Sequence, residues 1–477
     1  MAGILAAFHP MILSQFRLMQ TDAGDSRFNH YVLEHSYRWV TGDPMHREFW
    51  NPPIFYPQKN VLAYSDTLAT VAPPYWGLRS LGLAPIPAFG CWMILMMGLT
   101  FLSGYALLRH GLRQGAVGAV FGAWLITFAS PRWIQMGHQQ LLPHFFTLTA
   151  FHALFVLFGR ENLSAKTRRV WWSLFWSCVV CQFYASYYYG FFLFLVLGLA
   201  AVGAMFAREI RRKGFAVARA DLRFVLSGGT IAGLLIGPLA WHYLSVAREV
   251  GMRSYEKIGL PHLPSYLWMG STNWLYGGTK EWTLFRDLPN FHGQAMGLGF
   301  VATSVLGWML LKYRHERFVR ILLFVMASLF IFCTVVPGNK TLFRVWFYTV
   351  PGIQAIRVMS RIGILFAIPA AYALSRRLST AKRPRALVTW LILGTICCLE
   401  QVHLPLVYDT REVQTHVDAI RVRVENEDSK LPFYVEPAPD REPTWAQLDA
   451  MWASLELGRP TVNGYSGNLP PEYQLLK

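Results

Sequence analysis

The sequence predicts an all-α polytopic membrane protein with about eleven transmembrane helices, a large first outer loop and a small soluble α/β C-terminal tail. Of the 477 residues, 53% are hydrophobic and 15% are charged, whereas a soluble chain usually has about 25% charged residues. Apolar runs recur along the chain, and basic residues lie in short clusters between these runs. Composition and alternation together indicate a chain that crosses a membrane many times.

The apolar runs give the expected spans in order. They occupy residues 2–18, 84–108, 114–130, 140–158, 170–185, 187–207, 224–243, 296–311, 321–336, 362–375 and 386–402. Several are shorter than the roughly 20 residues that a full span needs, so we expect tilted helices or extension into flanking aromatic residues. Residues 2–18 are interpreted as an uncleaved first span. Residues 170–207 form two spans only if the SYYYG sequence at 186–190 separates two helices.

Five short loops between the runs are rich in Lys and Arg and poor in acidic residues. These basic loops are 109–113, 160–169, 208–223, 312–320 and 376–385. Cytoplasmic loops carry the excess of basic residues in membrane proteins, so we expect a cytoplasmic N-terminus and a C-terminal tail outside. The net charge of +17 is divided among these loops instead of forming one patch, so no nucleic-acid partner is expected.

This orientation divides the chain into a transmembrane domain, residues 1–402, and an outer-face soluble tail, residues 403–477. The tail has a soluble composition that predicts a helix followed by a strand. It is interpreted either as a small lid or as the opening of a larger, truncated domain. The NGYSGN sequence at 463–468 is interpreted as a loop of this small unit.

The first outer loop, residues 19–83, is much longer than an ordinary connection and holds the carboxylates of Asp22, Asp25 and Asp66. Aromatic and apolar residues recur at helical spacing over residues 26–40, which predicts an amphipathic helix lying in the membrane interface. Asp25 either caps this helix or acts as a base or metal ligand. This loop is therefore the first candidate for chemistry.

The second half of this loop, residues 51–66, contains three prolines, which prevent a regular helix. Tyr56 and Tyr64 offer ring faces on which a sugar could stack. Aromatic residues of this kind are also common in ordinary loops at a membrane surface, and both interpretations stay open.

Several short motifs resemble one known superfamily. They are GDSR at 24–27 with the following YVLEH at 31–35, WNPPIFYP at 50–57, AYSD at 63–66, GHQQLLP at 137–143 and PGIQAIRVMSRIG at 351–363. Over about residues 15–375 the chain resembles polytopic bacterial membrane glycosyltransferases of the GT-C superfamily, and the last motif resembles an uncharacterised subgroup. The resemblance implies a multi-span helical fold in the bacterial inner membrane, an active site on the outer face and a polyprenyl-phosphate-linked sugar donor.

The resemblance also implies an acidic residue in the first outer loop, acting as general base toward an acceptor hydroxyl or as a metal ligand. Asp25 matches that position, with Asp22 second, and Asp66 is the second carboxylate. No cofactor is expected apart from an optional divalent metal. The loop lacks the adjacent Asp-Asp or Asp-Glu pair of better-known members, which leaves metal use open.

The leaving phosphate needs positive charge, and Arg357 and Arg361 are four residues apart, on one face of the segment if it is helical. Arginine suits phosphate because its planar fork can bind two oxygens. The alternative is a pair of arginines that extend to the membrane interface. Of the two, Arg357 is expected to matter more. Arg132 and His138 lie within the SPRWIQMGHQQ sequence and are expected to complete the pocket. Arg132 is expected to contact the phosphate and His138 the substrate.

The sequence thus predicts transfer of a sugar from a polyprenyl-phosphate donor to an outer-face lipid or glycan acceptor, in contact with membrane lipids. Two alternatives stay open: a lipid or glycan transporter or flippase, and a GT-C-like scaffold without activity. A transporter usually has ionisable residues within its spans, whereas the spans predicted here are almost free of charge.

Overall fold

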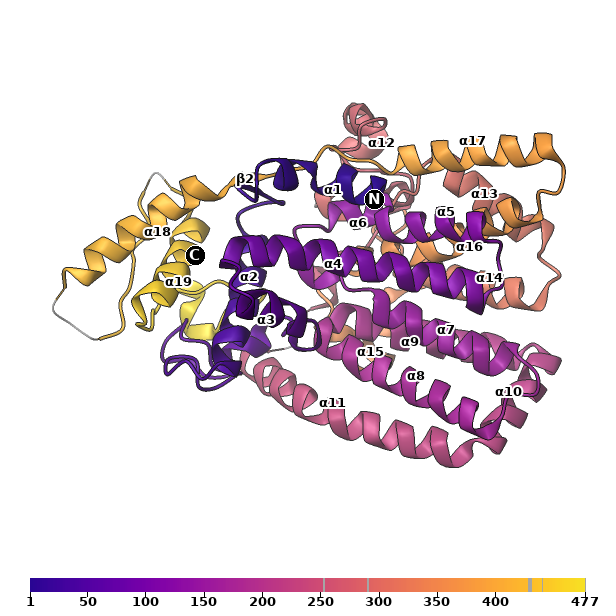
Figure 1. Cartoon of the computed structure of the whole chain (residues 1–477), viewed down its shortest axis with the longest axis horizontal. Coiled ribbons are helices and arrows are strands. Elements are labelled where there is room, and N and C mark those ends of the chain that lie inside the picture. Colours follow the sequence, from indigo (N-terminus) through magenta and orange to yellow (C-terminus); the bar gives the residue numbers. More distant parts are fainter. Residues whose placement is uncertain (252–253, 290, 428–430, 440, 477) are drawn as a thin grey trace.

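The computed structural model describes residues 1–251, 254–289, 291–427, 431–439 and 441–476. Long helices run along the length of the molecule, and the C-terminal helices cover one end of them (Figure 1). The helices are α1 (Ala2–Leu13), α2 (Asp25–Val40), α3 (Pro73–Ser80), α4 (Pro85–Ala106), α5 (Ala116–Phe128), α6 (Ser130–Ile134), α7 (Phe145–Gly159), α8 (Ala165–Ala185), α9 (Tyr187–Met205), α10 (Arg208–Ala220), α11 (Leu222–Val250), α12 (Thr283–Arg286), α13 (Phe300–Lys312), α14 (Arg317–Cys333), α15 (Phe343–Thr349), α16 (Gly363–Thr380), α17 (Pro384–Glu400), α18 (Thr410–Glu425) and α19 (Pro443–Leu457). Two short strands, β1 (Leu18–Met19) and β2 (Tyr408–Asp409), pair antiparallel.

Each of the eleven apolar runs forms a helix, but the count of eleven spans is not confirmed. Within the described residues, five helices are long and apolar enough to cross a membrane. They are Pro85–Gly111, Ala116–Ile134, Gln139–Gly159, Tyr187–Met205 and Leu222–Val250. The helix in the first run, α1, has 12 residues. Helix α8 ends at Ala185 and α9 begins at Tyr187, so the sequence at 186–190 does separate two helices.

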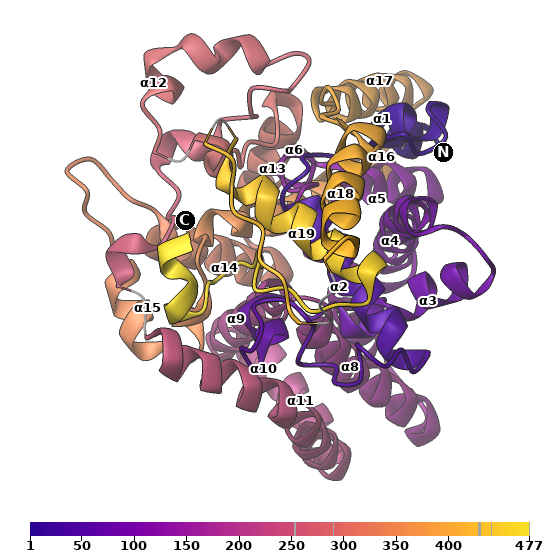
Figure 2. The same cartoon turned by 90° about the vertical axis from the view of Figure 1, so that its left-hand side faces the viewer.

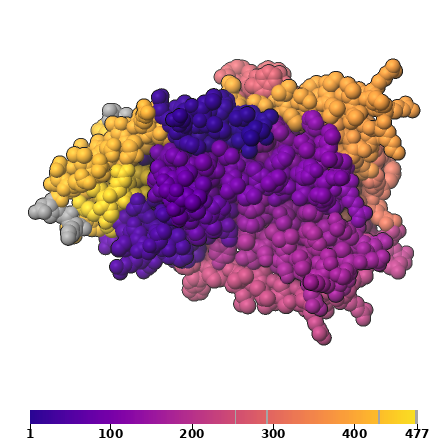
Figure 3. Space-filling model, in the orientation of Figure 1, coloured from indigo at the N-terminus to yellow at the C-terminus, as the bar shows by residue number. Residues whose placement is uncertain are grey.

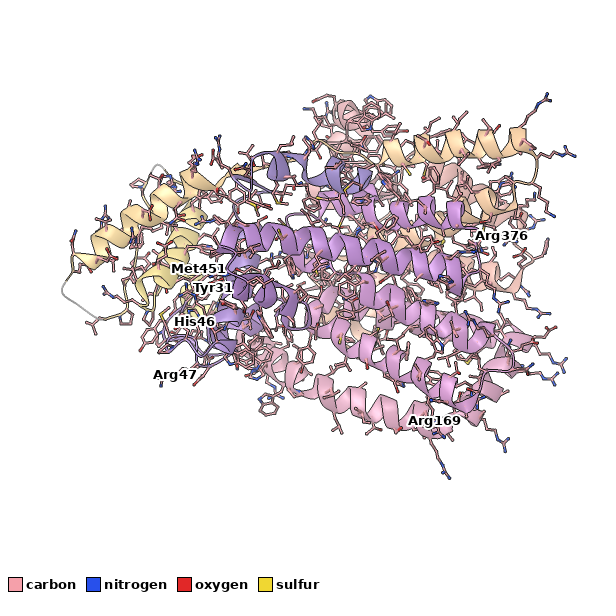
Figure 4. All side chains as sticks on the ribbon, in the orientation of Figure 1. Tyr31, His46, Arg47, Arg169, Arg376 and Met451 are labelled. Carbon is pink, nitrogen blue, oxygen red and sulfur yellow. The ribbon has the colours of Figure 1, made fainter. Side chains whose placement is uncertain are left out.

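Residues of the basic loops lie at one end of the molecule. Arg169 and Arg376 lie at the right-hand end of Figure 4, whereas Tyr31, His46 and Met451 lie at the left-hand end. The connections around α10, between α13 and α14, and between α16 and α17 also lie at the right-hand end (Figure 1). The molecule thus has a basic end and, opposite to it, an end formed by α2 and the tail.

Helices α5 and α16 pack very closely, and this contact positions the candidate site. A side chain at Gly118 would overlap the carbonyl of Ser375, and one at Gly122 would come within 2.9 Å of the carbonyl oxygen of Ala371. Small residues let helix backbones approach in this way. The segment after α5 carries His138, and the segment before α16 carries Arg361, so both segments meet at the end opposite the basic loops.

Helix α2 forms where the sequence predicts a helix, but protein encloses it where the amphipathic pattern predicts an exposed face. Residues 26–36 are all buried. One side packs into the bundle, where the ring of His30 stacks on Phe89 of α4 at 4.5 Å, and the same ring lies 4.6 Å from Trp452 of α19. The tail therefore covers the face that the sequence pattern assigned to water or lipid head groups.

The tail lies against the N-terminal third of the chain, as the adjoining yellow and indigo surfaces in Figure 3 show. Seen from this end, α18 and α19 lie in front of α2 (Figure 2). A buried ion pair holds them together, because Arg27 Nη1 of α2 is 2.8 Å from Asp449 Oδ1 of α19. Arg441 donates to the other oxygen of Asp449 at 2.7 Å. Burial lowers the pKa of Arg27, and the charge of Asp449 opposes this effect.

The predicted strand of the tail does not form. The described part of the tail contains α18, α19 and β2, and the segment around Phe433 makes only an isolated bridge to Thr461. The polar NEDSK sequence after α18 leads to an irregular segment, whose backbone is instead satisfied by Asn463. The division into domains 1–402 and 403–477 stays a prediction.

Asp449→Asn is expected to destabilise the protein by about 3–5 kcal/mol, because it leaves Arg27 buried without a counter-charge. The measurement is the thermal unfolding midpoint in detergent, together with protease sensitivity of the tail. Asp418→Asn is the control: Asp418 forms an exposed pair with Arg421 at 3.6 Å, and its loss should cost less than about 1 kcal/mol. Equal midpoints for the two variants would contradict a tail held by the buried pair.

Candidate functional site

The start of α2 separates the roles of Asp22, which precedes the helix, and Asp25, which begins it. Asp22 Oδ1 accepts hydrogen bonds from the backbone N–H groups of Gly24 at 2.8 Å and Asp25 at 3.1 Å. Asp22 therefore satisfies the free N–H groups at the helix start, as a cap does. The surrounding protein, together with the nearby charge of Asp25, raises the pKa of Asp22. The interpretation of Asp25 as the cap is wrong, and its carboxylate is available for other contacts.

The Asp25 carboxylate lies between the tail and the turn before α7. Its Oδ1 accepts a hydrogen bond of 2.6 Å from the hydroxyl of Tyr465. Its Oδ2 lies 3.3 Å from His138 Nδ1, and about a quarter of each of these two side chains is exposed. Burial and the charges of Arg361 and Arg357 hold the pKa of His138 well below its usual value. This shift favours the uncharged ring beside Asp25.

Side-chain hydrogen bonds hold the GHQQ motif against α2. Gln139 Nε2 donates to Ser26 Oγ at 2.6 Å, and Asn29 Nδ2 donates to Gln139 Oε1 at 3.1 Å. Gly137 lies so close to Asp22 that a Cβ atom at this position would collide with the carboxylate. These contacts account for the Gly, His and Gln of this motif and for the Ser and Asn of the DSRFN sequence. They bring His138 to Asp25.

The charges of Arg357 and Arg361 act on each other, but the segment that carries them is not a continuous helix. Arg357 lies in an irregular stretch between the 3₁₀ turns Ile353–Ala355 and Met359–Ile362. The hydroxyl of Tyr188, from α9, accepts hydrogen bonds of 3.1 Å from the backbone N–H groups of Arg357 and Val358. The Arg361 guanidinium lies over the ring of the same tyrosine, 4.6 Å from its centroid. Tyr188 thus organises the arginine segment.

Arg361 is a buried cation on which the charges of Asp25 and Asp66 act. Its side chain is 4% exposed, and its Nε atom has no partner within the part of the chain that the structure describes. Burial lowers the pKa of Arg361, and the charge of Arg357 lowers it further. The charges of Asp25 and Asp66 act in the opposite direction. A buried guanidinium of this kind is costly unless an anion compensates it.

Asp66 is the second carboxylate near Arg361. It is buried, and its Oδ1 accepts a hydrogen bond of 2.6 Å from the backbone N–H of Tyr187. Burial raises the pKa of Asp66 to about 6, while this hydrogen bond and the charge of Arg361 lower it. Residues Asp22, Asp25, Asp66, His138, Tyr188, Arg357, Arg361 and Tyr465 are called the Asp25 cluster below.

Asp66→Asn is expected to change how stability depends on pH. The folded protein holds the proton of Asp66 up to about pH 6, whereas the unfolded chain releases it near pH 4. Stability is therefore lost as the pH rises through 6, by up to roughly 3 kcal/mol. The Asn variant lacks this loss, so its thermal midpoint relative to wild type should be higher at pH 7.5 than at pH 4.5. The same difference at both pH values would contradict a raised pKa.

Three predicted site residues do not join the Asp25 cluster. Arg132 is buried, and its guanidinium donates to the carbonyls of Thr127 and Leu142 and to the hydroxyl of Tyr189. It supports the turn around residues 127–142, which corrects the expectation of a phosphate contact.

The two predicted stacking tyrosines also lie elsewhere. Tyr56 is 45% exposed, and its carbonyl accepts a hydrogen bond from the hydroxyl of Tyr473. Tyr64 is buried, and its hydroxyl accepts from Gln58. Tyr64 is thus held within its own loop, whereas Tyr56 is exposed, and a stacking role for either ring stays a prediction.

The sequence did not indicate two members of the cluster. Tyr188 belongs to the SYYYG sequence, which pattern analysis identified only as a helix boundary. Tyr465 belongs to NGYSGN, which was interpreted as an ordinary loop. The one available signal was the pair of Asn-Gly and Gly-Asn steps on both sides of a single aromatic residue, and that pattern is typical of any tight turn.

The side chains do not form an evident metal site. Within the described residues, no three His, Cys, Asp or Glu side chains converge as metal ligands. Asp22 already accepts two backbone N–H groups, and the charges that act on the nearby His138 are those of the cations Arg361 and Arg357. The residues present do not fit the divalent metal of the metal-dependent members, and no step is assigned to one.

The fold of this chain is similar to the folds of known membrane proteins. The structure is similar to the apo oligosaccharyltransferase of Archaeoglobus fulgidus, with 13% identity and a TM-score of 0.53, over 97% of this chain and 64% of that one. This chain thus spans less than two thirds of the length of that enzyme. It is also similar to ArnT from Cupriavidus metallidurans in the apo state (14% identity, 95% of this chain, 84% of that chain, TM-score 0.47) and bound to undecaprenyl phosphate (12%, 96%, 84%, 0.49).

The archaeal oligosaccharyltransferase is a GT-C glycosyltransferase, and the similarity to its structure confirms the predicted GT-C-like fold. The fold makes this a multi-pass membrane protein. By sequence, the chain belongs to the family described as "Domain of unknown function (DUF6311)", which matches residues 1–346. No curated protein matches it.

Proposed function

We propose that this protein transfers a sugar from a polyprenyl-phosphate-linked donor to a hydroxyl group of an outer-face lipid or glycan acceptor. One observation carries the proposal: the half-buried Asp25 carboxylate lies within electrostatic range of the buried Arg361, whose guanidinium Nε lacks an acceptor. A carboxylate can take a proton from an attacking hydroxyl, and an arginine can hold a leaving phosphate. These are the two requirements of glycosyl transfer from a lipid phosphate.

The proposed reaction uses the two charges on opposite sides of the sugar. Asp25 Oδ2 accepts the proton of the acceptor hydroxyl as its oxygen forms a bond to the anomeric carbon. The bond between this carbon and the phosphate oxygen breaks, and its electron pair leaves with the phosphate. Arg361 and Arg357 bind the phosphate oxygens as negative charge develops on them. The neutral His138 stays beside Asp25 and limits the directions from which the hydroxyl can approach.

The charge distribution supports the orientation expected from the sequence. Arg169 and Arg376 of the basic loops lie at the end opposite Tyr31 of α2 (Figure 4), the helix that begins with Asp25, and basic loops favour the cytoplasmic side. The cluster and the tail, residues 403–477, would then face the outer side of a bacterial inner membrane, with the N-terminus cytoplasmic. Nucleotide sugars are absent on that side, which is consistent with a lipid-linked donor.

The test is an assay of purified protein in detergent or proteoliposomes. A panel of radiolabelled polyprenyl-phosphate sugars is supplied with membrane lipid and glycan acceptors, and transfer of the label is measured. Transfer that depends on Asp25 supports the proposal. Movement of the lipid-linked sugar between leaflets without transfer would instead identify a flippase. Absence of both, in folded protein with the full panel, would overturn an enzymatic role.

A further inference from the structure

The segment Asn463–Asn468 of the tail crosses the Asp25 cluster and is held on both sides of it. On one side, the side chain of Asn463 exchanges two hydrogen bonds with the backbone of Val435, at 2.7 and 2.8 Å. On the other side, the N–H of Asn468 donates to the carbonyl of Tyr64 at 3.2 Å. The residues between these contacts therefore have a defined position over the cluster.

Two residues between the held ends contact the two charged groups of the proposed reaction. The hydroxyl of Tyr465 donates to Asp25 Oδ1 at 2.6 Å, and Arg357 Nη1 donates to the carbonyl of Gly467 at 2.9 Å. Burial and the charge of Asp25 raise the pKa of Tyr465, so the phenol keeps its proton and acts as the donor. One short segment thus contacts both the proposed base and a proposed phosphate ligand.

The two contacts have different chemical consequences. Tyr465 occupies only one oxygen of Asp25, and the other oxygen, beside His138, stays available for an acceptor hydroxyl. Gly467 offers Arg357 a neutral carbonyl, whereas a phosphate oxygen forms a shorter and stronger bond to a guanidinium. A bound donor can therefore replace the Gly467 contact while the Tyr465 contact remains.

We propose that Tyr465 is a further positioning residue of the transfer site, which holds Asp25 with Oδ2 toward the acceptor, and that Gly467 releases Arg357 when the donor phosphate binds. The tail then belongs to the transfer site, and its contact with Arg357 changes when the donor binds. This inference rests on the proposed function for its kinetic part. Its structural part, the exchange of the Gly467 carbonyl for a phosphate, can be measured without turnover.

The kinetic test compares Tyr465→Phe with Tyr473→Phe. Tyr473 also belongs to the tail and donates to the carbonyls of Phe55 and Tyr56, so its loss affects tail packing without affecting Asp25. Tyr465→Phe is expected to lower kcat by about 10- to 100-fold with the donor KM within about 3-fold, because a hydrogen bond to a charged group is lost. Tyr473→Phe is expected to change kcat by less than about 3-fold. Equal effects in the two variants would overturn the positioning role.

A second measurement separates positioning from general support of the fold. In an Asp25→Asn background, which removes the base, Tyr465→Phe is expected to lower the residual activity by less than about 2-fold. An additional loss as large as in the wild-type background would mean that Tyr465 acts independently of Asp25.

The binding test uses hydrogen exchange of peptides that cover residues 463–468, in detergent. A polyprenyl phosphate is expected to speed exchange in this segment, and the matching polyprenol without phosphate is expected to have no effect. Arg357→Gln should remove the response, and Tyr465→Phe should speed exchange before any lipid is added. No change with polyprenyl phosphate would overturn the release of Gly467. If wild-type protein shows this response but transfers no sugar, the proposed function fails while the tail contact stands.

Discussion

Asp25→Asn is expected to lower sugar transfer by about 10³-fold, because the variant removes the carboxylate proposed as the general base, and general-base catalysis typically contributes 10²–10⁴-fold. The substitution keeps the shape of the side chain, and the amide oxygen can still accept the hydrogen bond of Tyr465. Folding and donor binding should therefore be preserved. The measurement is kcat with a lipid-linked donor, with the thermal midpoint recorded on the same preparation.

Asp22→Asn is the matched comparison for this prediction. Asp22 accepts the N–H groups of Gly24 and Asp25, and Asn caps a helix about as well as Asp. If Asp22 is only a cap, its variant should keep transfer within about 5-fold of wild type. Asp43→Asn, in the same loop but paired with Arg38, controls for the general loss of negative charge. A loss for Asp22→Asn as large as for Asp25→Asn would assign the base to Asp22.

Arg361→Gln is expected to lower kcat/KM for the donor by about 10²- to 10³-fold, since removing one group that stabilises developing negative charge has an effect of this size. The thermal stability should not fall, because the wild-type guanidinium is buried without an acceptor at Nε and its removal relieves a desolvation cost. Loss of activity without loss of stability is therefore the expected signature. It is measured by donor titration and thermal unfolding of the same samples.

Two other arginine variants sharpen this prediction. Arg357 is only partly buried and contacts the Gly467 carbonyl, so Arg357→Gln should cause a smaller loss than Arg361→Gln. This order is the reverse of the one expected from the sequence. Arg132→Gln should instead lower stability and activity together, because it leaves the carbonyls of Thr127 and Leu142 without their donor. Unchanged activity in Arg361→Gln would remove Arg361 from the phosphate site.

The prediction from the sequence was most accurate where a property depends on neighbouring residues along the chain. Every apolar run became a helix, and the break between α8 and α9 falls within the predicted sequence. The short motifs also marked Asp25, Asp66, His138, Arg357 and Arg361, which the structure brings into one cluster, although their roles remain proposals. Periodicity and charge alternation are local properties, so they predict the helices without knowledge of the tertiary contacts.

The failures have a common cause, which is contact between distant segments. Helix α2 has the pattern of an interfacial helix, but α19 buries its polar face through Arg27 and Asp449. Arg132 has the charge of a phosphate ligand, but nearby carbonyls occupy its donors. A pattern along the chain cannot show which partner a polar side chain meets.

The sequence by itself determined the class of this protein: a helical membrane protein with basic loops at one end and acidic and aromatic loops at the other. Only the tertiary structure decided that Asp22, and not Asp25, accepts the backbone N–H groups at the start of α2. It also decided that Tyr465 donates a hydrogen bond to Asp25, 440 positions away in the sequence. The reason is physical. Helix formation depends on local periodicity, whereas a hydrogen bond of 2.6 Å depends on how the tail packs on the bundle, and no local pattern encodes that distance.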